Sequence, residues 1–205
     1  ALNVGGGSNM LFCTDYPGVL IKNAMDSVSL HGKHTIRCGA GAHLDDVVAF
    51  SVQNNLYGLE PLSYIPGTIG GAIVLNAGAY GANIGHYLKA VRAYDTENNR
   101  IVTLEASELN YWHRTSIFRS QHGSRWIIMD ADLHVSVKPI EHIHPKINSD
   151  LHGQELRDQI KILRSHLPNP SEQKNAGSFF LNPTVTNLKA ENIRKSHSDA
   201  SMRPY

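Results

Sequence analysis

Short apolar runs separated by turn-forming residues dominate the first two thirds of the chain. Runs rich in Val, Ile and Thr that are bounded by Gly, Asn and Asp are typical of β-strands. Between two such runs, the segment Tyr94–Arg100 carries Asp-Thr-Glu-Asn-Asn, a composition that predicts a hairpin turn. The pattern predicts strands at Leu2–Val4, Leu11–Cys13, Val19–Ile21, Val28–Leu30, Thr35–Cys38, Ala90–Ala93, Arg100–Thr103 and Trp126–Val135.

Helical periodicity replaces strand periodicity in a few places, most clearly after residue 152. Leu156, Ile160 and Leu163 share one helical face with charged residues opposite, and Pro168-Asn-Pro then stops a helix. An earlier helix is expected to stop at the run Leu56-Tyr-Gly-Leu, where Gly58 suits a left-handed conformation. The predicted helical segments are Leu44–Asn54, Ala106–Leu109, Gly153–Leu163 and Leu188–Ser196.

The strand-rich part of the chain ends near Pro139–Pro145. Since domains typically contain about 100–150 residues, a chain of 205 residues fits one large domain or two unequal ones. We therefore predict a first domain over residues 1–140 and a second over residues 141–205. The chain begins directly on strand-like residues and ends on Met-Arg-Pro-Tyr, so we expect it to be part of a longer protein.

The composition narrows the class of protein and of partner. Hydrophobic residues make up 41% and charged residues 18%, which is ordinary for a globular protein and argues against disorder. The formal net charge of +1 provides no field that would gather nucleic acid. No apolar run approaches the roughly 18 residues of a membrane span, and no secretory signal opens the chain.

The positions of cysteine and histidine residues bear on whether the protein has a disulfide bond or a metal site. Cys13 and Cys38 lie far apart in the sequence, and we expect two free buried thiols, with a disulfide as the alternative. Because the closest histidine pairs have no nearby cysteines, we expect surface histidines and no metal site. These pairs are His31 with His34, and His142 with His144 in a strand-like run.

Two glycine-rich stretches leave the backbone without side chains. Gly5–Asn9 follows the first strand and permits a sharp turn whose N–H groups suit phosphate oxygens; a plain tight turn is the alternative. The second stretch, Pro61–Gly81, holds Gly-Gly, Asn-Ala-Gly and Tyr-Gly around the apolar residues Ala72–Leu75, which we expect to be buried. Two such stretches suggest a long flat ligand with a pyrophosphate, such as FAD, although structural turns would also use some of these glycines.

Four stretches taken together carry a family resemblance. GGGSN at Gly5–Asn9 is followed by IPGTIGGAIVLNAGAYG at Ile65–Gly81, YWHRTSIFR at Tyr111–Arg119 and NAGSFFLNP at Asn175–Pro183. In order and spacing, over nearly the whole chain, they resemble the UDP-N-acetylenolpyruvoylglucosamine reductases, the MurB flavoenzymes of bacterial peptidoglycan synthesis. The resemblance implies an α+β fold, with an FAD-binding domain of the vanillyl-alcohol-oxidase/PCMH type and part of a smaller α+β substrate domain.

The resemblance also implies partners and roles in the reaction. It implies NADPH as reductant, a UDP-sugar as substrate, a cytoplasmic location and a part in cell shape and division; we further expect a monomer. In the family, flavin passes hydride from NADPH to an enolpyruvyl double bond, so that UDP-N-acetylglucosamine enolpyruvate becomes UDP-N-acetylmuramate.

Three residues match the family's reacting and binding side chains. Ser178 matches the proton-donating serine, and Arg114 matches the arginine that holds the substrate carboxylate by two parallel hydrogen bonds. Asn182 matches a residue at the substrate's diphosphate. Without the family, these residues would be interpreted as a serine capping its turn, an arginine in a surface ion pair and an Asn-Pro turn.

Backbone N–H groups of the two glycine stretches would hold the FAD, while Asn76 would either bind the cofactor or hold its own loop together. The bend Asn175-Ala-Gly is expected to aim the Ser178 hydroxyl, with Phe179 and Phe180 pinning it. The cofactor-binding positions that the resemblance implies are Gly5, Gly6, Gly7, Ser8, Asn9, Pro66, Gly67, Gly70, Gly71, Asn76, Gly78 and Tyr80.

Several positions depart from the family pattern. His113 stands where many members have tyrosine, and Asn148 where one subclass has a substrate-sensing tyrosine. His166, expected at the substrate's diphosphate, replaces a lysine; because histidine is mostly neutral near pH 7, that contact would be weaker or pH-dependent. No residue matches the family's glutamate near the C-terminus. Two alternatives therefore stay open: a non-catalytic flavin- or nucleotide-binding relative, and another FAD oxidoreductase of the same superfamily.

Overall fold

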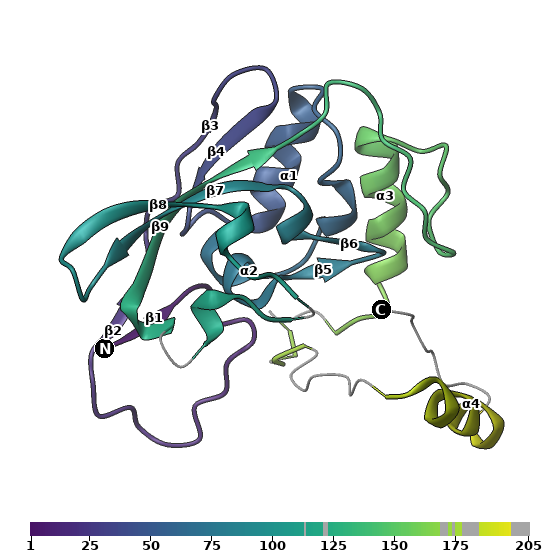
Figure 1. Cartoon of the computed structure of the whole chain (residues 1–205). Coiled ribbons are helices and arrows are strands. Elements are labelled where there is room, and N and C mark those ends of the chain that lie inside the picture. The colour runs from purple at the N-terminus through teal and green to yellow at the C-terminus, as the bar shows by residue number, and fades with distance from the viewer. Residues whose placement is uncertain (113, 121–122, 169–171, 174, 178–184, 198–205) are drawn as a thin grey trace.

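The structure is a computed structural model that describes residues 1–112, 114–120, 123–168, 172–173, 175–177 and 185–197. In these residues the largest sheet has five strands in the order β3-β4-β9-β7-β8, and every neighbouring pair is antiparallel (Figure 1). The predicted strands at these places and the hairpin turn between β7 and β8 are confirmed. The strands are β3 (Val28–Leu30), β4 (Thr35–Gly39), β7 (Leu88–Asp95), β8 (Arg100–Glu105) and β9 (Trp126–His134).

The alternation of side chains along the strands separates a buried face from an exposed one. In β4 the side chain of Ile36 is buried, and Arg37 next to it lies on the opposite face. Arg37 pairs with Asp132, its register partner in β9, at 2.8 Å between Nη2 and Oδ2. Arg92 of β7 pairs with Asp130 of β9 in the same manner. The outer face of the sheet is therefore covered by cross-strand ion pairs.

A two-stranded parallel sheet, β1 (Leu2–Val4) with β2 (Leu20–Lys22), forms apart from the main sheet. Strand β2 confirms the predicted strand with a shift of one residue. The loop between β1 and β2 is exposed, since Leu11 is 68% and Phe12 is 50% accessible. The strand predicted at Leu11–Cys13 is therefore wrong, because no strand in the described part of the chain pairs with its backbone.

Helix α1 (Leu44–Gln53) confirms the predicted helix after β4. It ends earlier than expected, because Asn54 caps it and Asn55 takes the left-handed conformation with φ 54°. Gly58 also has a positive φ, 119°, but it lies beyond the helix. The helix stop predicted at Gly58 is therefore wrong.

Helix α2 (Ile69–Leu75) occupies the second glycine stretch and was not predicted. Thr68 caps its N-terminus and Asn76 ends it in the left-handed conformation, with φ 45°. Glycines in a helix interior are unfavourable, which hides the helix in the sequence. Gly70 nevertheless allows close packing, because a Cβ there would lie 3.1 Å from the carbonyl oxygen of Ala40.

One cluster of buried apolar residues joins the main sheet to α1 and α2. Ala72 and Ile73 belong to it, as expected, while Val74 and Leu75 are only half-buried. Burial of this apolar surface is the main favourable contribution to folding. The bulkiest fully buried members of the cluster include Ile36, Leu44, Leu59, Leu62, Ile69, Ile73, Ile84, Leu109 and Leu133.

Short elements connect the larger ones. The hairpin β5 (Gly78–Ala79) and β6 (Ala82–Asn83) follows α2. The turn η3 confirms the helical turn predicted at 106–109. The short 3₁₀ helices are η1 (Glu60–Leu62), η2 (Ile84–His86), η3 (Ala106–Glu108), η4 (Ile117–Arg119) and η5 (Gly123–Arg125).

Helix α3 (Gly153–Arg164) confirms the predicted helix and packs on η1. The carboxylate of Glu60, 1% exposed, accepts the Gly153 N–H at 3.2 Å, and Nε2 of His142 lies 3.7 Å from Glu60 Oε2. Burial raises the pKa of Glu60, but His142 and backbone N–H groups lower it by more, so the pKa lies below its ordinary value. The segment after residue 140 thus packs directly on the strand-rich part, and the domain boundary there stays a prediction.

The histidine and cysteine predictions hold only in part. The run Glu141-His-Ile-His is irregular rather than a strand, and His142 is 8% exposed, so the expected surface histidine is wrong there. Cys13 and Cys38 are both free, as expected, but Cys13 is exposed and only Cys38 is buried. Burial raises the pKa of the Cys38 thiol. Within the described residues, no three His, Cys, Asp or Glu side chains gather to hold a metal.

Helix α4 (Asn187–Ser196) confirms the last predicted helix. Thr186 caps it by accepting the Lys189 N–H at 3.4 Å. Figure 1 shows α4 away from the main sheet. No helix of the described chain has the length and apolar character needed to cross a bilayer.

Candidate active site

A cleft of about 2350 Å³ brings together segments that are far apart in the sequence. Its lining comes from the first ten residues, from the segment 64–80, from η4 and β9, and from α3 and α4. Ligand pockets for single small molecules are usually ~300–1,000 Å³. The cleft is therefore large enough for more than one ligand.

The two glycine stretches lie against each other in this cleft. A Cβ on Gly5 would lie 2.5 Å from Oγ1 of Thr68, and a Cβ on Gly67 would lie 2.7 Å from Oγ of Ser8. The Ser8 hydroxyl donates to the carbonyl of Pro66 at 3.0 Å, which ties the stretches together. Gly7 has φ 72° and open space around its Cα, so its backbone is accessible from the cleft. Both loops therefore need glycine where they meet.

The cleft gathers nearly all of the predicted cofactor-binding positions. Asn76 is the exception: it is buried, its amide donates to the Trp112 carbonyl at 3.1 Å, and its Oδ1 accepts the Gly85 N–H at 3.1 Å. These contacts correspond to the alternative in which Asn76 holds its loop. The predicted positions that line the cleft are Gly5, Gly6, Gly7, Ser8, Asn9, Pro66, Gly67, Gly70, Gly71, Gly78 and Tyr80.

Arg114 also lines the cleft. Its Nη2 lies 3.5 Å from the carbonyl oxygen of Gly78, and its own carbonyl accepts a hydrogen bond from Arg119 at 2.8 Å. Arg114 forms no ion pair with any residue that the structure describes. Its guanidinium is therefore available to an anionic ligand.

His166 lies beside the cleft rather than on it. It is exposed and lines a smaller hollow of about 550 Å³, which shares Tyr80, Lys146, Ser165 and Leu167 with the cleft. Lys161 and Arg164 of α3 line the cleft itself. The sequence analysis did not identify either residue. Cations are common in the last turn of a helix because they interact favourably with the helix dipole, so they do not by themselves indicate a binding site.

The cleft is strongly cationic. Its lining has six cationic side chains and a single acidic one among the residues described, although the whole chain has 19 Lys and Arg against 18 Asp and Glu. Like charges around a low-dielectric cleft concentrate the field and attract anions. The cationic residues are Arg114, Arg119, Lys146, Lys161, Arg164 and Arg194, and the acidic one is Glu191.

The bend predicted before Ser178 is confirmed. Oδ1 of Asn175 accepts the Gly177 N–H at 3.0 Å, and Gly177 has φ 60°. Asn175, Ala176 and Gly177 line the cleft, so the chain that leads to residue 178 runs along it. The remaining predicted positions Ser178, Asn182 and His113, and also Phe179 and Phe180, lie outside the described residues.

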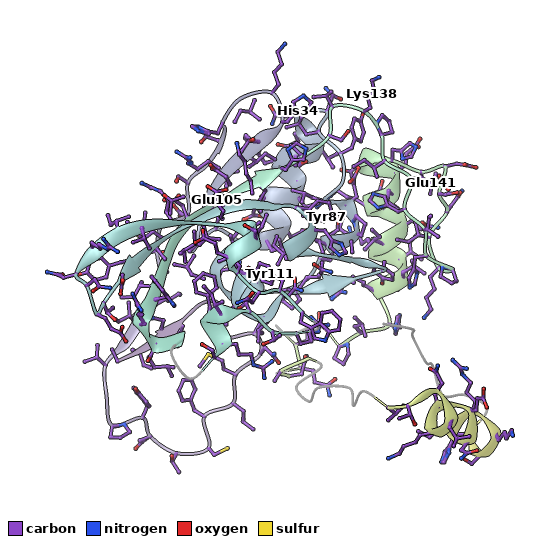
Figure 2. All side chains as sticks on the ribbon, in the orientation of Figure 1. His34, Tyr87, Glu105, Tyr111, Lys138 and Glu141 are labelled. Atoms are coloured by element: carbon purple, nitrogen blue, oxygen red, sulfur yellow. The ribbon has the colours of Figure 1, made fainter. Side chains whose placement is uncertain are left out.

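Two polar atoms near the site are buried without a protein partner. Oδ1 of Asn9, on the cleft, accepts no hydrogen bond from the described residues, and the Tyr111 hydroxyl is likewise unpartnered. A buried acceptor without a donor costs free energy unless a ligand or water completes it. Tyr111, labelled in Figure 2, is half-buried against the main core cluster, and burial raises its pKa, so the hydroxyl stays neutral.

Two tyrosines on the cleft have unusual backbones. Tyr64 has φ 58° and Tyr80 has φ 51°, both in the left-handed region. For a residue other than glycine this conformation costs on the order of 1–3 kcal/mol. Tyr64 was not predicted as a site residue, since nothing in the sequence marks an aromatic residue with this conformation.

Known proteins resemble this chain over nearly its whole length. Residues 2–105 match the FAD binding domain family. The chain is 34% identical over 216 residues to the UDP-N-acetylenolpyruvoylglucosamine reductase of Porphyromonas gingivalis, covering 98% of this chain and 63% of that protein. It is 34% identical over 210 residues to the enzyme of the same name from Alcanivorax borkumensis, covering 96% of this chain and 60% of that protein. The chain thus spans less than two thirds of the length of these relatives.

The solved structure of the reductase MurB from Thermus caldophilus has the same fold. Its TM-score is 0.69 at 24% identity, and the match covers 93% of this chain and 65% of that one. The predicted α+β fold with an FAD-binding domain and the resemblance to the reductases are confirmed. The chain belongs to the FAD binding domain family and is similar over nearly its whole length to the UDP-N-acetylenolpyruvoylglucosamine reductases.

Proposed function

We propose that the chain carries the FAD site and much of the substrate site of a UDP-N-acetylenolpyruvoylglucosamine reductase. The reaction is the NADPH-dependent reduction of an enolpyruvyl ether on a UDP-amino sugar to a lactyl ether, a step of peptidoglycan precursor synthesis. One observation carries this proposal: the two interlocked glycine stretches and the unpaired Arg114 share one cleft. The proposal includes a cytoplasmic, monomeric protein.

The residues of the cleft fit FAD. The side-chain-free surfaces of Gly5–Gly7 and Gly67 admit a flat ligand close to the backbone, and the unpartnered Oδ1 of Asn9 suits a ligand N–H or O–H donor. The excess of cationic lining residues suits a pyrophosphate, and would also attract NADPH and a UDP-sugar, which are polyanions too. Backbone groups of Ser8–Asn9 and Pro66–Gly67 would hold the cofactor.

The protein's own groups bind, orient and protonate the substrate. When bound, FAD supplies hydride transfer from NADPH to the substrate's double bond. Arg114 binds the substrate carboxylate through two charge-assisted hydrogen bonds and stabilises the negative charge that develops beside it. Ser178, the next residue in the sequence after the bend Asn175–Gly177, would donate the proton to the substrate carbon.

A visible absorption spectrum of the protein that contains this chain, purified without added flavin, is the first test. We expect the bands of bound oxidised flavin. NADPH oxidation is then followed with and without UDP-N-acetylglucosamine enolpyruvate, and we expect turnover only with the UDP-sugar. Bound flavin with turnover on another substrate would favour a different FAD oxidoreductase, and bound flavin without turnover a non-catalytic relative.

A further inference from the structure

Positive φ values at residues other than glycine follow a pattern in this protein. Among the described residues there are seven, and four of them are asparagines that do not themselves line the cleft. Asparagine tolerates the left-handed conformation, so those positions need no special explanation. The other three are Tyr64, Tyr80 and Arg114, and all three line the cleft.

Such conformations persist where the surrounding structure enforces them, and they gather at ligand sites. Tyr80 and Arg114 already belong to the family motifs described above. Tyr64 belongs to no stretch that carries the resemblance, since it lies just before Ile65. The same reasoning therefore identifies Tyr64 as an additional residue of the site.

A dedicated set of contacts holds Tyr64 in place. Its N–H donates to Oδ1 of Asp45 at 2.8 Å, so a side chain from α1 fixes the strained backbone. The Arg157 guanidinium lies 5.0 Å from the centre of the Tyr64 ring, within the range of a cation–π contact. Arg157 also donates to both carboxylate oxygens of Asp45, at 3.1 and 3.3 Å, and to Ser63 Oγ at 3.3 Å.

Arg157 is itself only 5% exposed, so the contact of α3 with Tyr64 and Asp45 is made by a buried cation. The Tyr64 ring also packs against a small apolar cluster of Ile147, Leu156 and Ile160. It remains half-buried, with part of its surface on the cleft. Asp45 fixes the backbone of Tyr64, and Arg157 contacts its ring. A ring held in this way presents a rigid surface to a ligand.

We infer that Tyr64 contacts the flat ring system of the bound flavin, and that Arg157 is a positioning residue that acts through Tyr64. This inference rests on the proposed FAD binding. The flavin is favoured over the other ligands because Tyr64 leads directly into Ile65–Thr68, the stretch that interlocks with Gly5–Ser8. Aromatic side chains pack favourably against flat heterocycles.

The test measures FAD affinity of the apoprotein, by titrating it with FAD and following flavin fluorescence. Tyr64→Ala should weaken binding about tenfold, and Tyr64→Phe, which keeps the ring, should stay within about twofold of wild type. The matched control is Tyr57→Ala. Tyr57 is also half-buried and adjoins α3 at Gly153, but it lies off the cleft. Its loss should lower the melting temperature without changing FAD affinity.

Arg157→Met tests the positioning role, since methionine keeps an unbranched apolar stem without the guanidinium. It should weaken FAD binding several-fold in the wild-type background and have no effect on affinity in the Tyr64→Ala background. A merely structural Arg157 would lower the melting temperature in both backgrounds and leave FAD affinity unchanged in both. If Tyr64→Ala does not fold, Tyr64→Leu gives the same comparison with more of the volume kept.

Equal FAD affinity in wild type and Tyr64→Ala would overturn the inference while leaving the proposed function intact. An unchanged FAD affinity combined with a raised KM for NADPH or for the UDP-sugar would move the contact to that ligand and overturn the flavin assignment. If wild-type protein bound no FAD, the proposed function would fail instead.

Discussion

Arg37, Arg92 and Arg125 each bind a carboxylate of the main sheet, whereas Arg114 and Arg164 bind none among the residues described. The sheet arginines neutralise their charge within the fold, and the Arg125 guanidinium holds the pKa of the Asp95 carboxyl well below its usual range. The cleft arginines keep an uncompensated charge in a concave site. The comparison suggests that the sheet cations serve stability and the cleft cations serve ligand binding.

The largest expected effect concerns the chemistry that the cleft cations serve. Ser178→Ala should leave reduction of the flavin by NADPH nearly intact and slow the oxidation of reduced flavin by substrate by about 10²–10⁴-fold. The two half-reactions are measured separately by stopped-flow absorbance. Equal losses in both would mean that Ser178 is structural.

A cleft arginine and a sheet arginine are next compared directly. Arg114→Lys keeps the charge but loses the two-pronged geometry, so oxidation of reduced flavin by substrate should slow on the order of 10²-fold. Arg92→Lys, the matched control on the sheet, should leave both half-reactions unchanged. A wild-type rate for the Arg114 variant would remove its role at the carboxylate.

Lys161 and Arg164 of α3 should contribute more to binding of the UDP-sugar than His166, the residue that the family resemblance indicated. Replacing Lys161 and Arg164 together by Gln should raise the KM for the UDP-sugar about tenfold and weaken its dependence on salt. His166→Ala should change that KM by less than about twofold, because His166 lies off the cleft. Steady-state kinetics at two ionic strengths check both variants. The opposite order of effects would restore the diphosphate contact to His166.

The smallest expected effect is on the free energy of unfolding, from removing the Arg37–Asp132 ion pair of the main sheet. The hydrogen bond from Arg37 lowers the pKa of Asp132 in the folded protein, so the pair contributes stability above the unfolded-state pKa of roughly 3.9. That contribution is lost as the pH falls from this value through the folded-state pKa. Asp132→Asn should therefore cost less than ~1 kcal/mol at pH 7, and the difference should shrink at acid pH. Urea unfolding at several pH values measures it.

The strands of the main sheet were predictable because their signal is local. Alternation in β4, and in β9 an apolar start followed by alternation of aspartate with apolar residues, identify each strand without knowledge of its neighbours. Leu11–Cys13 has an equally apolar sequence but no partner strand in the described residues, and strand formation depends on that partner. Helix α2 was hidden because Gly70 and Gly71 lower the helix propensity of its first turn, while the close packing of Gly70 on Ala40 that explains one of them is not visible in the sequence.

The residues of the candidate site could be predicted where they belong to a sequence motif. The glycine stretches and Arg114 were found from their sequence and all reach the cleft. Tyr64 and Lys161 could not be found in this way, because their positions depend on the packing of α3 against η1. Asn76 shows the opposite case, since its place in a motif suggested a ligand and its amide bonds to the backbone instead.

The buried Glu60 carboxylate that accepts the Gly153 N–H has a mechanical consequence. Swinging α3 outward would remove one of the donors that a buried carboxylate has, alongside the Gly58 N–H and His142, which is unfavourable. Helix α3 should therefore turn with the sheet as one rigid unit, and the Gly153 amide should resist hydrogen exchange until that unit unfolds. Any widening of the cleft to admit a ligand would then have to come from lining elements other than α3.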